Sequence, residues 1–213
     1  MTRVRNEQTA NTRQRILATA EQLFAEQGIS SVSNRQISDA AGQANNFAVG
    51  YHFGGRSELV HAILDHHNTL IEPFRSRMVA ALGPEPDLRD WVTCLVQPQT
   101  DYFESLGKPT YFARFTAQVS VDPKHQLQLY DHAVVSEDLM SVLTGLYGSL
   151  PDLPEDVLGA RDSMARNMIL YTIADFESAD AAGTATGSWS DVKDYLVDGL
   201  LGLWLAPVTH PTR

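Results

Sequence analysis

The stretch from Ser33 to Leu59, SNRQISDAAGQANNFAVGYHFGGRSEL, constrains the fold more than any other part of the chain. Ser33 is placed to cap a short helix, and Gln36 stands three residues later, where a capping-box partner belongs. Gly42 supplies a residue that tolerates a positive φ where this helix must stop. A second short helix is expected to begin near Ala44 or Asn45 and to run to about His52. Two short helices joined by a glycine-containing turn are typical of a helix-turn-helix, whose second helix enters the DNA major groove.

Several residues in and around this stretch stand at spacings shared with a known family: Phe24, Gly28, Ile37, Ala41-Gly42, Tyr51-His52-Phe53 and Glu58-Leu59. In these elements, over roughly residues 12 to 64, the chain resembles the TetR family of transcriptional regulators. The interval from Gly42 to Phe53 is one residue longer than is usual in that family, so the register of the second helix stays open. The resemblance implies an all-helical protein with a DNA-binding head and a body that binds a small molecule.

Composition narrows the class of protein. The 213 residues are 43% hydrophobic and 20% charged, which is ordinary for a globular protein with a sizeable core. No apolar run is long enough for a membrane span, and no apolar segment follows the basic residues near the N-terminus. Cys94 is the only cysteine, which excludes an intrachain disulfide and a cysteine zinc site. We therefore expect a cytoplasmic protein without a metal or another cofactor.

Charge is distributed unevenly along the chain. The net charge is −10, but residues 1 to 56 carry six arginines and four acidic residues, a balance of +2. The remaining residues carry ten basic and twenty-two acidic side chains, a balance of −12. A mildly basic head on an acidic body favours approach of the head to phosphate, although +2 over 56 residues is also within ordinary scatter.

Apolar spacing predicts helices throughout the chain. Together with the resemblance it implies an all-α fold with a DNA-binding domain over residues 1–60 and a ligand-binding and dimerisation domain over 61–213. Residues 1 to 9 are expected to be a loose leader before a first helix. Pro73 is expected to kink the helix that follows the head, and Pro98 to interrupt a later one. The polar cluster His61, Asp65, His66 and His67 has no further ligand at metal-site spacing, so solvated side chains are expected. The remaining helices are predicted over 12–27, 57–82, 88–106, 109–121, 127–146, 155–180 and 190–205.

The head supplies the candidate DNA contacts. Asn side chains can bond adenine, an apolar ring can touch a thymine methyl, and Tyr and Arg can meet phosphate. Phe53 is expected to fill the core among the first three helices, and part of the apolar set Phe47, Val49 and Tyr51 must be core as well. For Asn45 and Asn46 a simple helix-capping role is the alternative. The predicted DNA-binding residues are Arg35, Asn45, Asn46, Phe47, Tyr51, His52 and Arg56.

Two further sets of residues are predicted in the body. A largely apolar pocket, suited to a neutral or cationic ligand, is expected among the middle helices, although the same aromatic residues can be plain core: Trp91, Tyr102, Phe103, Tyr111, Phe112 and Phe115. The last two helices carry regular apolar stripes, and Gly199 and Gly202 suggest close helix approach. A dimer interface is favoured over a monomer core, through Met168, Ile169, Phe176, Leu196, Leu200 and Leu203.

The predicted function is a DNA-binding transcriptional regulator: a homodimeric repressor released from a palindromic operator by an apolar small molecule. One alternative is a dimeric DNA-binding protein without a small-molecule inducer. A helical enzyme is disfavoured, because the sequence contains no nucleophile elbow, phosphate loop, dinucleotide fingerprint or zinc-protease motif. The expected partners are double-stranded operator DNA, an effector of unknown identity and a second copy of the chain, with no membrane.

Overall fold

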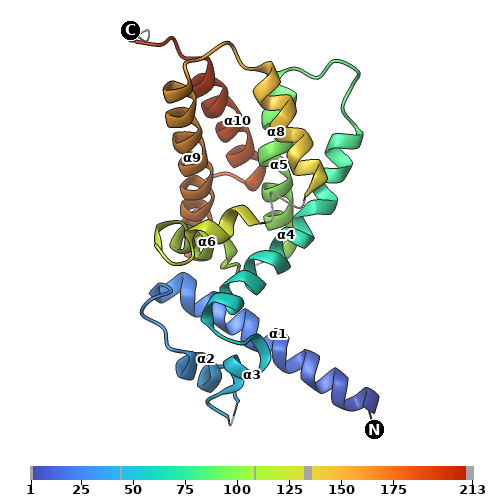
Figure 1. Ribbon diagram of the computed structural model, residues 1–213, viewed down its shortest axis with the longest axis vertical. Coiled ribbons are helices and arrows are strands. Elements are labelled where there is room, and N and C mark those ends of the chain that lie inside the picture. The colour runs from blue at the N-terminus through green and yellow to red at the C-terminus, as the bar shows by residue number, and fades with distance from the viewer. Residues whose placement is uncertain (1, 44, 108, 132–135, 210–213) are drawn as a thin grey trace. The chain divides into compact units, whose positions relative to one another are not determined.

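The computed structural model describes residues 2–43, 45–107, 109–131 and 136–209. These residues form helices and no strands, which confirms the all-α prediction (Figure 1). No helix in the described ranges is long and apolar enough to cross a membrane. The helices are α1 (Thr2–Gln27), α2 (Asn34–Ala40), α3 (Ala48–Phe53), α4 (Arg56–Ala80), α5 (Leu88–Leu106), α6 (Phe112–Val121), the 3-10 helix η1 (Gln126–Tyr130), α8 (Glu137–Ser149), α9 (Glu155–Ala181) and α10 (Trp189–Leu205).

Several helices differ from the prediction in their bounds. The expected leader is part of α1, which begins at Thr2, and the first 27 residues contain no glycine or proline that would stop a helix. Helix α5 continues through Pro98 instead of being interrupted there. The single helix predicted over 127–146 is divided into η1 and α8, and Ser136 caps the start of α8 by accepting a hydrogen bond from the Leu139 N–H.

Contacts divide the chain into two compact units. One comprises Met1–Asn68 and Tyr111–His132, and the other comprises Thr69–Thr110 and Ala133–Arg213. Helix α4 therefore contributes its first half to one unit and its second half to the other. The domain boundary predicted at residue 60 stays a prediction. The division into units reflects which residues contact one another, and it does not test whether a segment folds as an independent domain.

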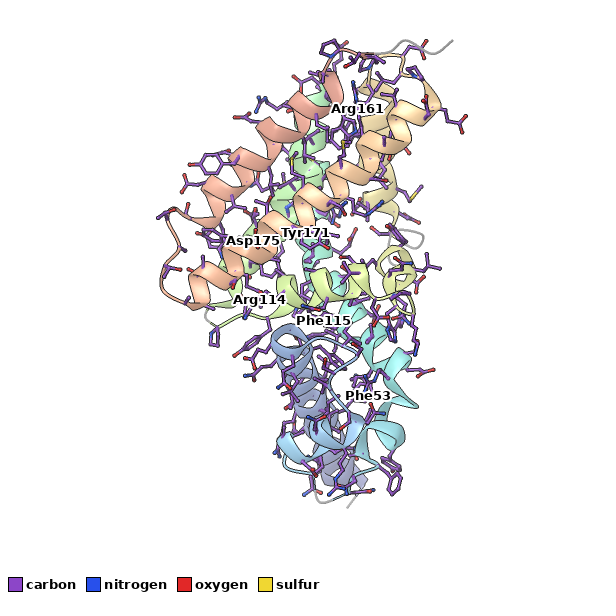
Figure 2. All side chains as sticks on the ribbon, turned by 90° about the vertical axis from the view of Figure 1, so that its left-hand side faces the viewer. Phe53, Arg114, Phe115, Arg161, Tyr171 and Asp175 are labelled. Carbon is purple, nitrogen blue, oxygen red and sulfur yellow. The ribbon has the colours of Figure 1, made fainter. Side chains whose placement is uncertain are left out.

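In the first unit, α1 packs against α2 and α6, and α2 packs against α3. Phe24 of α1 is fully buried and stacks on Phe115 of α6, with ring centroids 6.1 Å apart; Figure 2 labels Phe115 on its helix. His67 of α4 is also buried, with its Nε2 2.8 Å from Oε2 of Glu21. The prediction of a solvated histidine is therefore wrong for His67: a buried polar group requires a partner, and Glu21 supplies it. No group of three or more potential metal ligands occurs within the described residues.

In the second unit, α5 packs against α8 and α10, and α9 packs against α10 (Figure 1). Trp91 of α5 lies so close to Gly145 of α8 that a Cβ at Gly145 would stand 2.2 Å from the indole ring. Arg161, labelled near the start of α9 in Figure 2, donates hydrogen bonds of 2.6 Å to the carbonyl oxygens of Trp204 and Ala206. The arginine thereby satisfies carbonyl groups at the C-terminal end of α10, which have no partner within the helix.

Candidate nucleic-acid interface

Helix α2 begins and ends as the sequence predicts. The Ser33 Oγ accepts a hydrogen bond from the Gln36 N–H at 3.2 Å, and the Gln36 Oε1 accepts one from the Ser33 N–H at 2.7 Å. This reciprocal pair is the predicted capping box. At the other end Gly42 has a φ of +66°, and Arg15 of α1 donates a 2.7 Å hydrogen bond to the Ala41 carbonyl. A Cβ at Gly42 would stand 2.8 Å from the Arg15 Nη2, the mobile end of a long side chain, so the positive φ is the reason that this position favours glycine.

Helix α3 begins at Ala48, later than predicted. The Asn45 Oδ1 accepts a hydrogen bond from the Phe47 N–H at 3.0 Å, and the Asn45 carbonyl accepts one from the Ala48 N–H, also at 3.0 Å. These bonds form a turn closed by the Asn side chain, so Asn45 and Asn46 precede the helix. Ala44, the other expected starting point, lies outside the described residues. Helix α3 is thus short, and it begins only six residues after Gly42.

The two faces of α3 differ sharply in exposure. Val49 is fully buried, whereas Phe47 and Tyr51 are 81% and 78% exposed. Val49 is therefore the core member of the apolar set. Phe53, expected to fill the core, is only half-buried; the Arg13 guanidinium lies 4.7 Å from its ring centroid, and Figure 2 labels the ring. The cation covers the ring in place of core side chains.

The other residues predicted to contact DNA lie near Phe47 and Tyr51 in the sequence. Asn45 and Asn46 are exposed. Arg35 of α2 is exposed and lies 3.7 Å from Asp39, a long ion pair that leaves its side chain accessible. His52 is half-buried and packs edge-on against the Tyr51 ring, with centroids 5.0 Å apart.

Arg56 has intramolecular partners that the sequence did not reveal. Its Nη1 donates a 2.6 Å hydrogen bond to the Ile29 carbonyl, and its Nη2 donates one to the Val32 carbonyl. The guanidinium also lies 5.9 Å from the centroid of the Phe24 ring. Arg56 therefore ties the start of α4 to the segment between α1 and α2. Its predicted contact with phosphate stays a prediction.

The predicted ligand-binding residues lie in both compact units. Trp91, Tyr102 and Phe103 belong to one unit, and Tyr111, Phe112 and Phe115 belong to the other. Most of them pack as core: Phe103 stacks on Trp189 at 4.9 Å between centroids, and Phe112 stacks on His67 at 3.9 Å. Trp91 and Tyr111 are half-buried, and the other four are buried. The burial of these rings agrees with the alternative that they belong to the core. Their contact with a ligand stays a prediction.

A separate open groove lies on the surface of the second unit, between the start of α5 and the end of α10. None of the predicted ligand-binding residues lines it. Its lining residues are Asp87, Leu88, Arg89, Leu201, Gly202 and Leu205.

The residues predicted for the dimer interface also differ in burial. Ile169, Leu196 and Leu200 are buried within the chain, whereas Met168, Phe176 and Leu203 are half-buried. A Cβ at Gly199 would stand 3.2 Å from the Met168 sulfur, so this glycine serves the approach of α9 and α10 in one chain. Gly202 faces open space. The large apolar side chains that stay exposed on these helices are Met164, Tyr171, Tyr195 and Leu205.

Two parts of the chain, which together make up most of it, each match a known protein family. Residues 16–63 match the family described as bacterial regulatory proteins, tetR family, and residues 93–202 match the tetracyclin repressor-like C-terminal domain. The first match covers α2 and α3, and the second runs from α5 to α10.

Two individual relatives match over most of their length. The chain is 26% identical over 204 residues to the HTH-type transcriptional repressor AcnR of Corynebacterium glutamicum, covering 89% of this chain and 92% of that protein. The AcnR of Corynebacterium efficiens is 24% identical over 199 residues, which cover 86% and 89% of the two chains.

Solved structures share the fold. A putative tetR family regulator from Shewanella sp. PV-4 superposes with a TM-score of 0.58 at 18% identity, covering 92% of this chain and 97% of that one. The TetR family regulator PfmR of Thermus thermophilus gives a TM-score of 0.54 at 16% identity, with coverage of 89% and 97%. The chain therefore belongs to the TetR family of bacterial DNA-binding transcriptional regulators.

Proposed function

We propose that the protein is a homodimeric repressor that binds a palindromic operator through α2 and α3 and leaves it when a small molecule binds. Both AcnR relatives are HTH-type transcriptional repressors, which supports the sign of regulation. A protein that binds a chromosomal operator acts in the cytoplasm. The observation that carries the proposal is the outer face of α3, where two large aromatic side chains are exposed: Phe47 at the N-cap and Tyr51 within the helix.

We expect the outer face of α3 to contact both base edges and phosphate groups. Phe47 stands at the start of α3, where recognition helices meet bases, and Tyr51 follows four residues later on the same face. The Tyr51 hydroxyl is suited to a phosphate oxygen, and the exposed Arg35 of α2 adds a cation. Asn45 and Asn46 offer amide groups to base edges from the turn, and His52 supports the Tyr51 ring. Arg56 is left out of this set because its guanidinium already donates to two carbonyl groups.

The dimer interface is proposed on the exposed faces of α9 and α10. Two heads must lie about 34–36 Å apart to read successive major grooves, and a two-fold dimer provides this spacing on a palindrome. Met164 and Tyr171 stand seven residues apart on α9, so they share one face of the helix. Tyr195 and Leu205 are exposed on α10. Burying these side chains against a second copy would remove apolar surface that the single chain leaves in water.

The proposed ligand is largely apolar and either neutral or cationic. Between residues 90 and 150 only Lys108, Arg114 and Lys124 are basic, which disfavours a polyanion. A ligand that weakens operator binding tenfold must bind the DNA-bound protein tenfold more weakly, a coupling of about 1.4 kcal/mol. Because the predicted aromatic residues pack as core within each unit, binding within either set would require its rings to move apart.

The test begins with genomic DNA fragments retained by the purified protein, which are sequenced to identify a palindromic site. Anisotropy titrations on that site at several salt concentrations should show specific, salt-dependent binding. Compounds that raise the melting temperature are then added to the protein–operator complex. If no fragment is enriched, the DNA-binding part of the proposal fails. If every stabilising compound leaves operator affinity unchanged, the protein is a dimeric DNA-binding protein without an inducer.

A further inference from the structure

The ring of Phe47 is the most exposed large apolar side chain in the described residues, at 81%. The backbone that carries the ring is fixed, because the Phe47 N–H donates to the Asn45 side chain at 3.0 Å and the Phe47 carbonyl accepts from the Tyr51 N–H at 2.9 Å. Both backbone groups of this residue are thus used, while its ring is left in water. The fold of the single chain gives the ring no packing role.

Gly50 lies on the same face of α3, three residues after Phe47 and directly before Tyr51. Its φ is not positive, it is exposed, and a Cβ built on it meets nothing within 4 Å. Glycine weakens a helix relative to alanine, so neither backbone nor packing in this chain explains it. Gly148 of α8 is equally open, so an open glycine alone marks no site. Gly50 differs because two exposed aromatic rings flank it.

The chemistry of the major groove identifies what this face would meet. Base edges there display hydrogen-bond donors and acceptors, and the only apolar group is the C5-methyl of thymine. An aromatic ring presented by a recognition helix therefore has one good apolar partner in the groove. The positive balance of the head, +2 over residues 1 to 56, also suits a polyanion better than an apolar protein partner.

We propose that Phe47 contacts the C5-methyl of a thymine in each operator half-site, and that Gly50 lets the base edge approach the backbone of α3. The inference rests on the proposed function and deepens it, because it states which base the outer face of α3 selects. Cytosine at that position lacks the methyl group and is rejected, whereas 5-methylcytosine restores the apolar contact.

The first experiment removes the methyl group from the DNA. Starting from an operator that the protein binds, each thymine and its symmetry mate are replaced by deoxyuridine, one position at a time. One position should weaken binding by about fourfold per half-site, the effect of one buried methyl group. Phe47→Ala should bind more weakly overall and lose its sensitivity at that position alone. The matched control is Leu127→Ala in η1, an apolar residue of the same compact unit that is 73% exposed, and it should retain the wild-type profile.

Two results would overturn the thymine contact while leaving operator binding intact: no position is sensitive to deoxyuridine, or the sensitive position stays sensitive in Phe47→Ala. Failure to retain any DNA fragment would instead remove the proposed function, and this inference with it. If Phe47→Ala changes the oligomeric state without DNA, the ring packs against protein and the inference also fails.

The second experiment separates stability from recognition. Gly50→Ala and the control Gly148→Ala should each raise the melting temperature by about 2–4 °C, because both replace an open helical glycine. Only Gly50→Ala should weaken operator binding, by about tenfold, because its methyl group occupies space needed by the base edge. Unchanged operator binding by Gly50→Ala would show that close approach at Gly50 is not used.

Discussion

The two exposed rings on the outer face of α3 and the stacked rings of the second compact unit are placed in opposite ways. Phe47 and Tyr51 expose most of their surface, whereas Phe103 is buried and stacks on Trp189, which also contacts the edge of Phe176 at 4.6 Å between centroids. Both sets are large apolar groups, so the hydrophobic effect alone would bury both. The comparison therefore separates residues that stabilise the chain from residues that the chain keeps available for a partner.

This difference has a measurable consequence. Substitutions in the stacked rings should change the free energy of unfolding and affect DNA only through the fraction of folded protein. Substitutions on the outer face of α3 should change operator affinity and leave the free energy of unfolding nearly unchanged. The same distinction applies to α10, which has one buried face and one exposed face.

The largest effect is expected from Leu200→Asp in α10. Leu200 is fully buried within the chain, and an unpaired carboxylate there should cost more than about 4 kcal/mol, a large part of a typical domain's stability. Light scattering and circular dichroism should show unfolded or aggregated protein rather than a folded monomer. The control is Tyr195→Asp, because Tyr195 is 71% exposed on the same helix. This variant should stay folded and, under the proposed dimer, become monomeric; a folded Leu200→Asp protein would contradict the burial.

Phe103→Ala should be the next most severe change. Removing a buried, stacked phenylalanine costs about 3–5 kcal/mol, and the melting temperature should fall by about 6–20 °C. Denaturant unfolding measures this loss, and Phe47→Ala serves as the exposed counterpart, with an expected change within about 0.5 kcal/mol. Equal losses in the two variants would remove the distinction between the two sets of rings.

Arg56→Ala tests a residue for which sequence and structure suggest different roles. Loss of the hydrogen bonds to the Ile29 and Val32 carbonyls should lower the free energy of unfolding by about 2 kcal/mol. Arg56→Lys should recover only part of this loss, because an ammonium cannot reproduce the fork of the guanidinium. If Arg56 binds only these carbonyls, the salt dependence of operator binding should be unchanged. A slope lower by about one would instead support the phosphate contact.

Local features of the head could be read from the sequence. The Ser33–Gln36 capping box and the positive φ of Gly42 depend on residues only a few positions apart, so spacing is enough to predict them. The start of α3 was harder, because an asparagine before a helix serves equally as a cap or as a closed turn. Asn45 adopts the turn, which the sequence alone could not distinguish from the cap.

Long-range partners could not be predicted. Arg56 bonds carbonyl groups 27 and 24 residues away, and His67 pairs with Glu21 across 46 residues. No periodicity connects such positions, since only tertiary packing brings them together. The apolar stripes of α9 and α10 were recognisable, but a stripe does not reveal whether it faces its own chain. Leu196 and Leu200 face inward, while Tyr195 stays exposed.

The smallest effect is expected from Tyr147→Phe in α8. Unlike the exposed Tyr51, Tyr147 has a hydrogen-bond partner in the chain, and this difference should affect how stability depends on pH. Burial, together with the nearby carboxylate of Asp162, raises the pKa of Tyr147 to about 12, and its hydroxyl donates a 3.1 Å hydrogen bond to the Asp162 Oδ2. In the unfolded chain a tyrosine ionises near pH 10, so the folded state holds this proton after the unfolded state has lost it. The contribution of Tyr147 to stability is therefore complete below pH 10 and declines as the pH rises from 10 to 12.

Tyr147→Phe keeps the ring but has no proton to lose, so its free energy of unfolding should decline less than that of the wild type between pH 9 and 11. Denaturant unfolding at pH 9 and pH 11 gives this decline for each protein. Subtracting one decline from the other cancels the alkaline effects that the two proteins share. The difference should be small because Tyr147 is partly exposed, and water weakens its interaction with Asp162. Asp162→Asn provides a second check, because it removes the negative charge while keeping an acceptor for the hydroxyl group. A steeper alkaline decline in Tyr147→Phe than in the wild type would contradict the raised pKa.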